Sequence, residues 1–350
     1  MPIGYLLFTG ALAAVIWSAV SRHRPRRSSP LRLSYLLGGL LLNWPLLVLV
    51  LLAASTGLAI SQSGVASFGS WIGLAFAILA AIAVLILQRR ARGIRPAVES
   101  ALDEGLGSGW RDRVEAPAHR VQRMANIRYG PAGRANLLDL YRDRSDRSDR
   151  PVLIYLHPGA FRFGSKRLGA GHLMRRLASH GWVCINANYR LLGRGSSSDP
   201  VVDVKKVISW VRAHGGEYGA DPDAVFLAGG SAGAHLASVA ALTPGDTSVA
   251  GVVGLYGYYG AISVSAEAPP FFVVHGDQDT LVIVEDARRF VEQLRAVSSN
   301  PVVYAELPGT QHGFDLFRSR RLDTVIDGIE AFAAWVRRAR SHPEARSVLT

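Results

Sequence analysis

Residues Leu33 to Gln88 form a run of 56 positions without a single formally charged side chain. A water-soluble domain needs polar residues to face solvent, whereas a membrane-spanning helix needs about 20 consecutive apolar residues. The run can therefore hold two spans, separated by the small and polar residues near 61–69. Another uncharged apolar segment begins at Ile3. We predict three transmembrane helices, at about 3–20, 34–58 and 70–88, in a membrane anchor that covers residues 1–95.

Two arginine clusters flank these segments and predict their orientation. Neither the N-terminus nor the loop near 61–69 carries a charged residue, and three spans put both clusters on one side of the membrane, as the positive-inside rule requires. We therefore expect the N-terminus outside and everything after residue 89 in the cytoplasm. The alternative is a signal peptide at 1–20, but that segment lacks a basic region before its apolar core and a small-residue cleavage site. The clusters are Arg22, Arg24, Arg26, Arg27 and Arg32, then Arg89, Arg90, Arg92 and Arg95.

The net charge of +12 raises the question of nucleic-acid binding. Half of this charge, however, comes from residues 1–115, where nine of the eleven arginines flank the apolar segments. The distribution is typical of a membrane protein, so we expect no nucleic-acid partner. The single cysteine, Cys184, excludes a disulfide framework, and no Cys/His cluster has the spacing of a metal site, so no metal is expected.

After residue 118, short apolar runs alternate with helical patterns. Such alternation predicts an α/β domain with a mostly parallel sheet and helices on both faces. We place this domain at 119–340, after a mixed polar linker at 96–118 that includes a flexible glycine-rich loop at 105–109, and before a tail at 341–350. Strands are expected at about 124–129, 136–141, 151–156, 182–186, 224–228, 249–255, 271–275 and 302–306.

The segment Gly229-Gly230-Ser231-Ala232-Gly233 directly follows the expected strand 224–228 and precedes an apolar helix. It fits G-x-S-x-G, in which a sharp strand-to-helix turn strains the serine backbone and exposes its hydroxyl. Glycine is needed on both sides because larger residues would collide with the neighbouring chain. Ser231 is the candidate nucleophile.

A second loop, His157-Pro158-Gly159-Ala160-Phe161, follows the strand ending at Leu156. Pro158 has no N–H, so the donors to a developing oxyanion would be the N–H groups of Gly159 and Ala160, together with that of Ala232. His157 can be read either as a catalytic base or as a brace for the loop, and we favour the brace.

Two further loops supply an acid and a base. His275-Gly276-Asp277-Gln278-Asp279 follows the strand 271–275, and His312 follows the strand 302–306 after a Pro-Gly turn. The chain order serine, acid, histidine is that of an α/β-hydrolase triad. The other histidines lie in the basic loop or in helices, and His235 is expected to pack.

Taken together, residues 120–340 resemble an α/β-hydrolase carboxylesterase of the hormone-sensitive-lipase/feruloyl-esterase-like kind. The resemblance rests on five motifs in order, and three spans ahead of such a domain also resemble membrane-attached esterases of actinobacteria. These motifs are HPGAFRFGS at 157–165, NYRL at 188–191, GGSAGAH at 229–235, HGDQD at 275–279 and QHGF at 311–314.

The resemblance implies that Ser231 is the nucleophile, His312 the base and Asp279, rather than Asp277, its orienting acid. Several positions depart from the family pattern, among them Ala160 as the third small residue of its loop and the missing proline after the NYRL motif. Pro158 stands where glycine is usual, and Gly230 stands where the hormone-sensitive-lipase branch usually has aspartate, which favours the other branch. No cofactor is implied.

We therefore expect a membrane-anchored serine carboxylesterase or lipase-like hydrolase of a bacterial plasma membrane, acting on a small-molecule or lipid ester through an acyl-enzyme. The alternatives are a serine peptidase or amidase of the same fold, and a non-catalytic membrane sensor. Four aromatic residues could line an acyl pocket, or could simply pack in the core: Phe161, Tyr256, Tyr258 and Tyr259.

Overall fold

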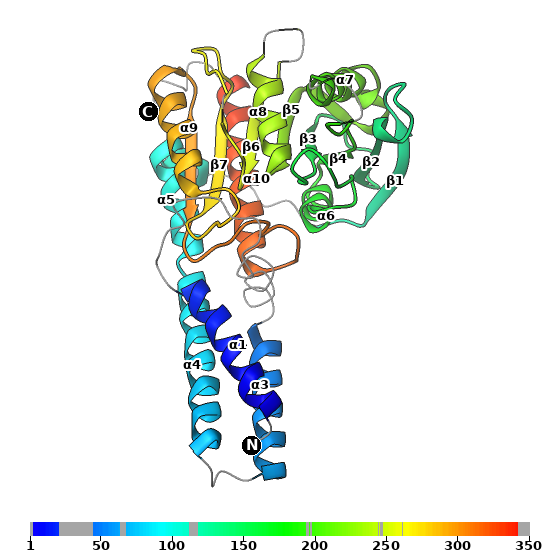
Figure 1. The fold of residues 1–350 in the computed structure, drawn as a ribbon. Coiled ribbons are helices and arrows are strands. Elements are labelled where there is room, and N and C mark those ends of the chain that lie inside the picture. Colours follow the sequence, from blue (N-terminus) through cyan, green and yellow to red (C-terminus); the bar gives the residue numbers. More distant parts are fainter. Residues whose placement is uncertain are drawn as a thin grey trace. The chain divides into compact units, whose positions relative to one another are not determined.

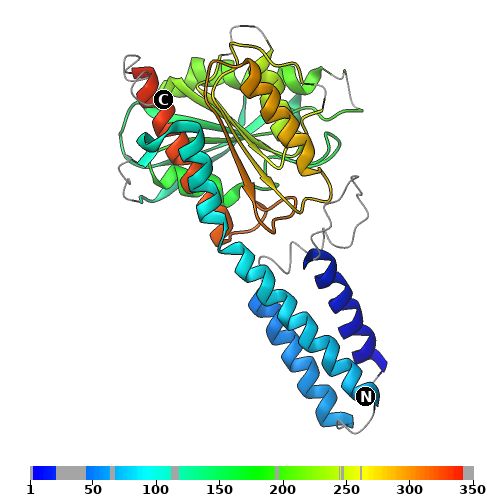
Figure 2. The same ribbon diagram turned by 90° about the vertical axis from the view of Figure 1, so that its left-hand side faces the viewer.

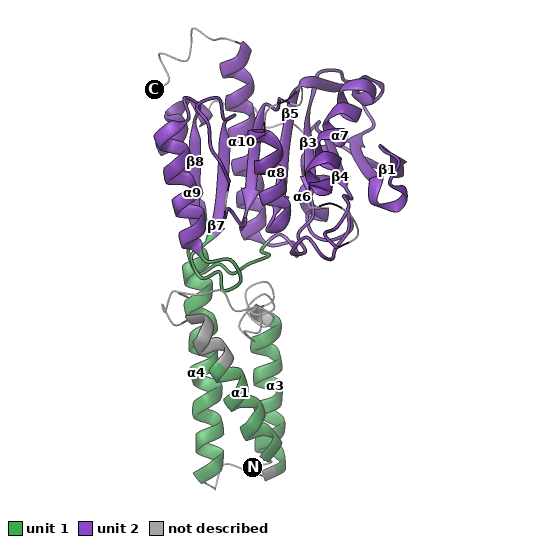
Figure 3. Ribbon diagram, turned by 45° about the horizontal axis from the view of Figure 1, so that its top comes forward, with its two compact units in different colours: residues 1–94, 276–283, 307–314 green, residues 95–275, 284–306, 315–350 purple. Residues whose placement is uncertain are grey.

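The computed structural model describes residues 3–20, 45–63, 68–111, 118–193, 196, 198–243, 245, 248–260 and 262–341. These residues form two compact units (Figure 3). Unit 1 comprises residues 1–94, 276–283 and 307–314, and unit 2 comprises residues 95–275, 284–306 and 315–350.

Unit 1 contains three apolar helices, α1 (Ile3–Val20), α3 (Pro45–Ser63) and α4 (Phe68–Ala91). Small residues of α4 such as Ala77, Ala80 and Ala83 are buried against the neighbouring helices, which allows close approach. The Tyr5 hydroxyl of α1 and the Thr56 hydroxyl of α3 form a hydrogen bond of 2.8 Å. Large apolar side chains cover the outer surface, among them Leu7, Val50, Phe68, Trp71, Ile78 and Leu85.

These helices correspond in part to the predicted spans. Within the described residues, one stretch, Phe68–Leu106, is long and apolar enough to cross a membrane, and Ile3–Ala14 and Leu47–Gln62 are shorter apolar helices. Ser61 to Ser63, where the polar turn was expected to begin, belong to α3. The first part of the second predicted span, the basic cluster at 22–32 and the tail at 342–350 lie outside the described residues. The three-span anchor stays a prediction.

Unit 2 is built around an eight-stranded sheet of order β1-β2-β4-β3-β5-β6-β7-β8 (Figure 1). The first two strands run antiparallel to their neighbours, whereas β4, β3, β5, β6 and β7 pair in parallel. This is the mostly parallel sheet expected from the alternating pattern. The strands are β1 (Val121–Arg128), β2 (Leu137–Asp143), β3 (Arg150–Leu156), β4 (Val183–Ala187), β5 (Ala220–Gly230), β6 (Gly251–Leu255), β7 (Phe271–Gly276) and β8 (Val302–Leu307).

Helices cover both faces of this sheet, and the side chains of β5 show why. Val225 and Leu227 belong to the core cluster that α7, α8 and α9 complete on one face. Phe226, one residue apart and so pointing the other way, packs against Phe332 of α10. Figure 2 shows α9 on one side of the sheet and α5 with α10 on the other. The helices of unit 2 are α5 (Ile94–Leu106), α6 (Gly171–Ser179), α7 (Asp199–His214), α8 (Ala232–Leu242), α9 (Val284–Val297) and α10 (Arg320–Ser341).

The predicted linker at 96–118 is wrong over most of its described length. Residues up to 106 belong to α5, and Ser108–Arg111 form a 3₁₀ helix. Val98 packs so closely on α10 that a Cβ at Gly328 would lie 2.8 Å from it, and a Cβ at Gly105 would lie 2.8 Å from Val303 of β8. Gly105 therefore permits α5 to pack closely on β8 rather than forming a flexible loop, and residues 95–106 of α5 belong to unit 2.

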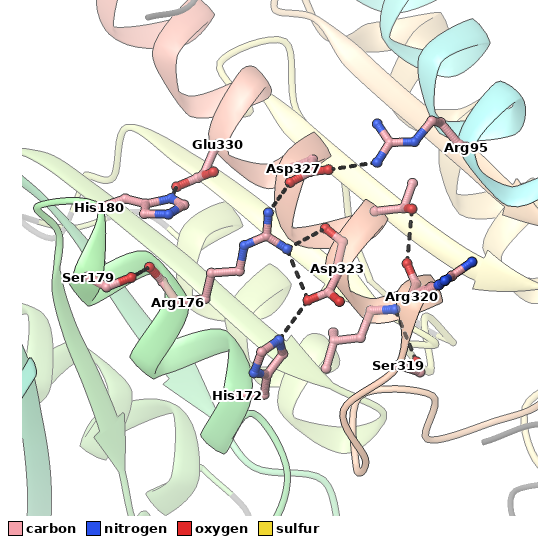
Figure 4. A network of polar contacts seen from close by, with 12 residues as sticks. Arg95, His172, Arg176, Ser179, His180, Ser319, Arg320, Asp323, Asp327 and Glu330 are labelled. Carbon is pink, nitrogen blue, oxygen red and sulfur yellow. Dashed lines mark hydrogen bonds and ion pairs between the residues drawn. The ribbon is translucent and has the colours of Figure 1, made fainter. Parts of the chain in front are cut away.

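Ion pairs join α6 to α10 (Figure 4). Arg176 of α6 donates to Asp323 at 3.0 Å and to Asp327 at 2.5 Å, both on α10. His172, near the start of α6, and His180, directly after its end, contact carboxylates of α10. Arg95 of α5 contacts Asp327 of α10 as well. Burial raises the pKa of Asp323, but the hydrogen bond from His172 and the charge of Arg176 outweigh it and hold this pKa below its usual value. The network fixes α6, the helix that follows the loop at 157–170.

Candidate active site

Ser231 is the single residue between the end of β5 and the start of α8, on the sharp turn that its sequence motif predicts. Its backbone has φ 53° and ψ −118°, a region that non-glycine residues rarely adopt. The Ser231 N–H donates to the carbonyl of Leu255 at 3.0 Å, which ties the turn to the end of β6. Ser231 is only partly buried. Such strain persists only where the surroundings over-determine it, and it is typical of functional sites.

The glycines of the motif have the steric role expected from the sequence. A Cβ at Gly229 would collide with the backbone of Gly233, and a Cβ at Gly233 would collide with the carbonyl of Leu156 at the end of β3. The turn is therefore closed on both sides by backbone, and only glycine fits.

The loop after β3 has an equally unusual backbone. Gly159, Ala160 and Phe161 all have positive φ, at 139°, 50° and 62°. The Gly159 carbonyl accepts the N–H groups of Arg162 and Phe163 at 2.9 and 3.0 Å, so the chain turns tightly here. Within the part of the chain that the structure describes, the N–H groups of Gly159 and Ala160 donate to no protein acceptor. Two donors on a tight turn are what an oxyanion site requires.

His157 braces this loop, as favoured from the sequence. It is buried, its ring stacks on Tyr189 at 4.3 Å, and its Nδ1–H donates to the Pro158 carbonyl at 2.8 Å. Burial lowers its pKa to about 4, so the ring is neutral at physiological pH. The Tyr189 hydroxyl in turn donates to the His157 carbonyl at 2.8 Å.

The far end of the same loop is held by a buried ion pair that the sequence reading missed. Lys166 donates from Nζ to Asp139 of β2 and to the Asn126 side chain, the latter at 2.9 Å. Arg123 of β1 also donates to Asp139, at 2.6 Å. Lys166 is one of only three lysines in a chain that otherwise uses arginine. This rarity was the feature of the sequence that could have pointed to a special role of Lys166.

The expected acid and base form a pair within unit 1. His312 Nδ1 lies 2.7 Å from Asp279 Oδ2, and both side chains are buried. The other oxygen of Asp279 accepts the N–H groups of Leu281 and Val282, each at 2.9 Å, which fixes the carboxylate. With Nδ1 as the donor to Asp279, Nε2 is left as the proton acceptor. Asp277, the alternative acid, accepts the Gly309 N–H at 2.7 Å and so positions the turn before His312.

The four aromatic residues suggested for an acyl pocket divide into two pairs. Phe161 lies edge-on to His235 at 5.4 Å, and the His235 ring lies 5.5 Å from Tyr258, whose side chain is 43% exposed. These two remain candidates. Tyr256 and Tyr259 are buried, and Tyr259 stacks on Phe290 of α9 at 4.4 Å. Of the two possibilities left open by the sequence, these two tyrosines fit packing in the core, because the clustered tyrosines alternate between the surface and the core.

No group of three or more His, Cys, Asp or Glu side chains could hold a metal ion within the described ranges. His235 packs as expected, with Nδ1 3.1 Å from the Tyr258 carbonyl, and burial lowers its pKa.

Comparisons with known proteins identify the family to which the chain belongs. A family model described as BD-FAE matches residues 138–260, from β2 to the loop after β6. The "Probable carboxylic ester hydrolase LipM" of Mycobacterium tuberculosis is 38% identical over 341 residues, which cover 76% of this chain and 78% of LipM. The chain belongs to this carboxylesterase family. It is an enzyme that hydrolyses carboxylic esters.

Two further comparisons concern a second relative and a solved structure. "Esterase LipQ" of the same bacterium is 36% identical over 257 residues, which cover 59% of this chain and 61% of LipQ. Among solved structures, Esterase B from Lactobacillus rhamnosus superposes with a TM-score of 0.53 at 17% identity, covering 74% of this chain and 98% of that protein. At this identity the likeness shows the α/β-hydrolase fold alone.

Proposed function

We propose that the esterase works through an acyl-enzyme on Ser231, with His312 as general base and Asp279 as its orienting acid. The observation that carries the proposal is the strained backbone of Ser231 at the end of β5. A serine hydroxyl is a weak nucleophile without a base, and the Asp279–His312 pair is a base with its tautomer already set.

In the proposed mechanism, His312 Nε2 takes the proton of Ser231 as Oγ attacks the ester carbonyl. The negative charge that develops on the carbonyl oxygen is bound by the N–H groups of Gly159, Ala160 and Ala232. His312 then protonates the leaving alcohol, and in the second half of the reaction it activates water to release the acid. Asp279 stabilises the imidazolium in both halves.

The role of Asp279 can be separated from that of Asp277. We expect Asp279→Asn to lower kcat by about 10⁴-fold, because the amide favours the wrong tautomer of His312. Asp277→Asn should have a much smaller effect, since Asp277 bonds to the Gly309 backbone. Steady-state hydrolysis of p-nitrophenyl esters measures both. An inversion of the two effects would make Asp277 the acid.

The fluorophosphonate test decides the wider proposal. The full chain in detergent is treated with a fluorophosphonate probe, and the labelled peptide is mapped by mass spectrometry. Wild-type labelling at Ser231 that is abolished in His312→Ala supports the mechanism. A folded, ester-hydrolysing wild type that reacts elsewhere contradicts it.

We further propose that residues 1–95 anchor the enzyme in a bacterial plasma membrane by three spans, with the chain after residue 89 in the cytoplasm. Support comes from the apolar outer surfaces of α1, α3 and α4 and from the arginine clusters in the sequence. A membrane-held active site favours a lipid or lipid-modified ester, so activity should rise with acyl chain length. A strong preference for soluble acetyl esters, unaffected by added vesicles, contradicts the lipid substrate.

The orientation can be tested with introduced cysteines, because the native Cys184 is completely buried. In intact cells, an impermeant maleimide should label Ser61→Cys, at the end of α3. It should label Ser299→Cys, on the surface of unit 2, only after permeabilisation. The reverse pattern overturns the orientation, and extraction of the protein by alkaline carbonate overturns the anchor.

A further inference from the structure

We propose that Asp315 is a positioning residue for the nucleophile turn. Its buried carboxylate accepts hydrogen bonds from the hydroxyls of Tyr155 and Tyr256. These hydroxyls in turn fix the position of the backbone at Gly230 and Ser231. The inference builds on the proposed role of Ser231 and assigns a function to a carboxylate that the mechanism above does not use.

The cluster joins three segments that are distant in the sequence. Tyr155 comes from β3, Tyr256 follows β6, and Asp315 comes three residues after His312. The Tyr155 hydroxyl donates to Asp315 Oδ2 at 2.5 Å, and the Tyr256 hydroxyl donates to Oδ1. All three side chains are 2% exposed or less.

Gly230, the residue before the nucleophile, lies directly on these hydroxyls. A Cβ there would be 2.9 Å from the Tyr155 hydroxyl, 2.7 Å from Tyr256 Cζ, and still closer to the Tyr256 hydroxyl. The absence of the aspartate expected in the hormone-sensitive-lipase branch thus has a physical reason, because the space it would occupy is filled by two tyrosine hydroxyls.

The backbone of Tyr256 is itself constrained. Its φ of 40° is unusual for a residue with a side chain, and its N–H donates to the Val274 carbonyl of β7 at 2.8 Å. The neighbouring Leu255 carbonyl accepts the Ser231 N–H. The two strained residues of this region, Ser231 and Tyr256, are therefore linked both through the backbone and through the Asp315 cluster.

Energetics favour a positioning role over a purely stabilising one. Burial of a carboxylate costs several kcal/mol, and buried ionic groups can often be replaced by apolar ones without loss of stability. The two hydroxyls remain donors at all working pH values, because burial and the charge of Asp315 raise the pKa of both tyrosines well above the usual value. The carboxylate accepts a hydrogen bond from each of the two tyrosine hydroxyls and so sets the positions of these hydroxyls next to Gly230.

The test compares Asp315→Asn, Tyr256→Phe and Tyr155→Phe with wild type in the full chain. Two quantities are measured, the second-order rate constant for fluorophosphonate labelling of Ser231 and the kcat and KM for a p-nitrophenyl ester, per labelled site. Asp315→Asn should lower the labelling rate constant and kcat by about 10- to 100-fold, since a displacement near 1 Å has effects of this size, with KM within about twofold. Each Tyr→Phe variant should show a smaller loss in the same direction.

Tyr304→Phe is the matched control, because its hydroxyl also bonds to a carboxylate, Glu306, at 2.9 Å on β8. It should label at the wild-type rate. A merely structural role of Asp315 would lower the fraction of labelled enzyme but leave the rate constant unchanged, and that result overturns the proposal. If Asp315→Asn does not fold, wild-type rate constants for both tyrosine variants overturn it equally. Wild-type enzyme that is not labelled at Ser231 overturns the proposed mechanism as well.

Discussion

Ser231→Ala should lower kcat for ester hydrolysis by a factor on the order of 10⁶, the loss found when the nucleophile of subtilisin is removed. In the proposed mechanism no acyl-enzyme forms without Oγ, and the Asp279–His312 pair has no hydroxyl to deprotonate. The oxyanion donors remain in this variant, so a residual rate above that in water is expected. The measurement is hydrolysis of a p-nitrophenyl ester by the purified full chain.

A serine in α8, the helix that follows Ser231, provides the control. Ser238 is buried in α8 and donates back to the Ala234 carbonyl at 2.9 Å. Ser238→Ala tests whether loss of any hydroxyl near the turn lowers turnover, and it should keep nearly full activity. If Ser231→Ala retains more than about 1% of wild-type kcat with the fold intact, another nucleophile acts and the acyl-enzyme on Ser231 is wrong.

The central strands could be predicted from the sequence because they are buried on both faces. Residues of β3, β4 and β6 are almost all apolar, and each predicted range is within about two residues of the observed one. Strand β1 lies at the sheet edge, where Gln122 and Arg123 face solvent, so its start was not visible as an apolar run. Helix α5 was missed because its amphipathic stripe is interrupted by Pro96 and Gly105, residues that usually mark loops.

The candidate site likewise contains residues that could be predicted from the sequence and residues that could not. The turn at Ser231, the loop at 157–161 and the Asp279–His312 pair have local motifs, so their residues could be named from the sequence as candidates for these roles. Their supports could not, because Asp315 meets Tyr155 across 160 positions and Lys166 meets Asp139 across 27. Such pairs depend on the order of strands in the sheet, which a single sequence does not reveal. The same limit explains why the buried Tyr259 was grouped with the exposed Tyr258.

The pair between Lys166 and Asp139 carries the largest stability effect that we expect. Both side chains are buried, at 5% and 0% exposed, and they tie the loop after β3 to the antiparallel edge of the sheet. Removal of one partner of a buried ion pair leaves the other charge without compensation, which typically costs about 3–5 kcal/mol. Asp139→Asn should therefore lower the free energy of unfolding of unit 2 by about this amount at pH 7, as measured by urea unfolding with tryptophan fluorescence. Asp146→Asn, at an exposed acid, is the control and should change it by less than about 0.5 kcal/mol.

The pH dependence of the difference in unfolding free energy between wild type and Asp139→Asn identifies the cause of this difference. Burial raises the pKa of Asp139, but the hydrogen bonds from Lys166 and Arg123 outweigh burial and hold the folded pKa below its usual value. The unfolded chain therefore binds the proton first as pH falls, so the stabilisation is complete well above pH 4 and is lost as pH falls through the folded pKa. The gap between wild type and Asp139→Asn should narrow in acid. A gap that stays constant from pH 7 to the acid limit would mean that the asparagine acts through packing, and the ionic account of this loop anchor would be wrong.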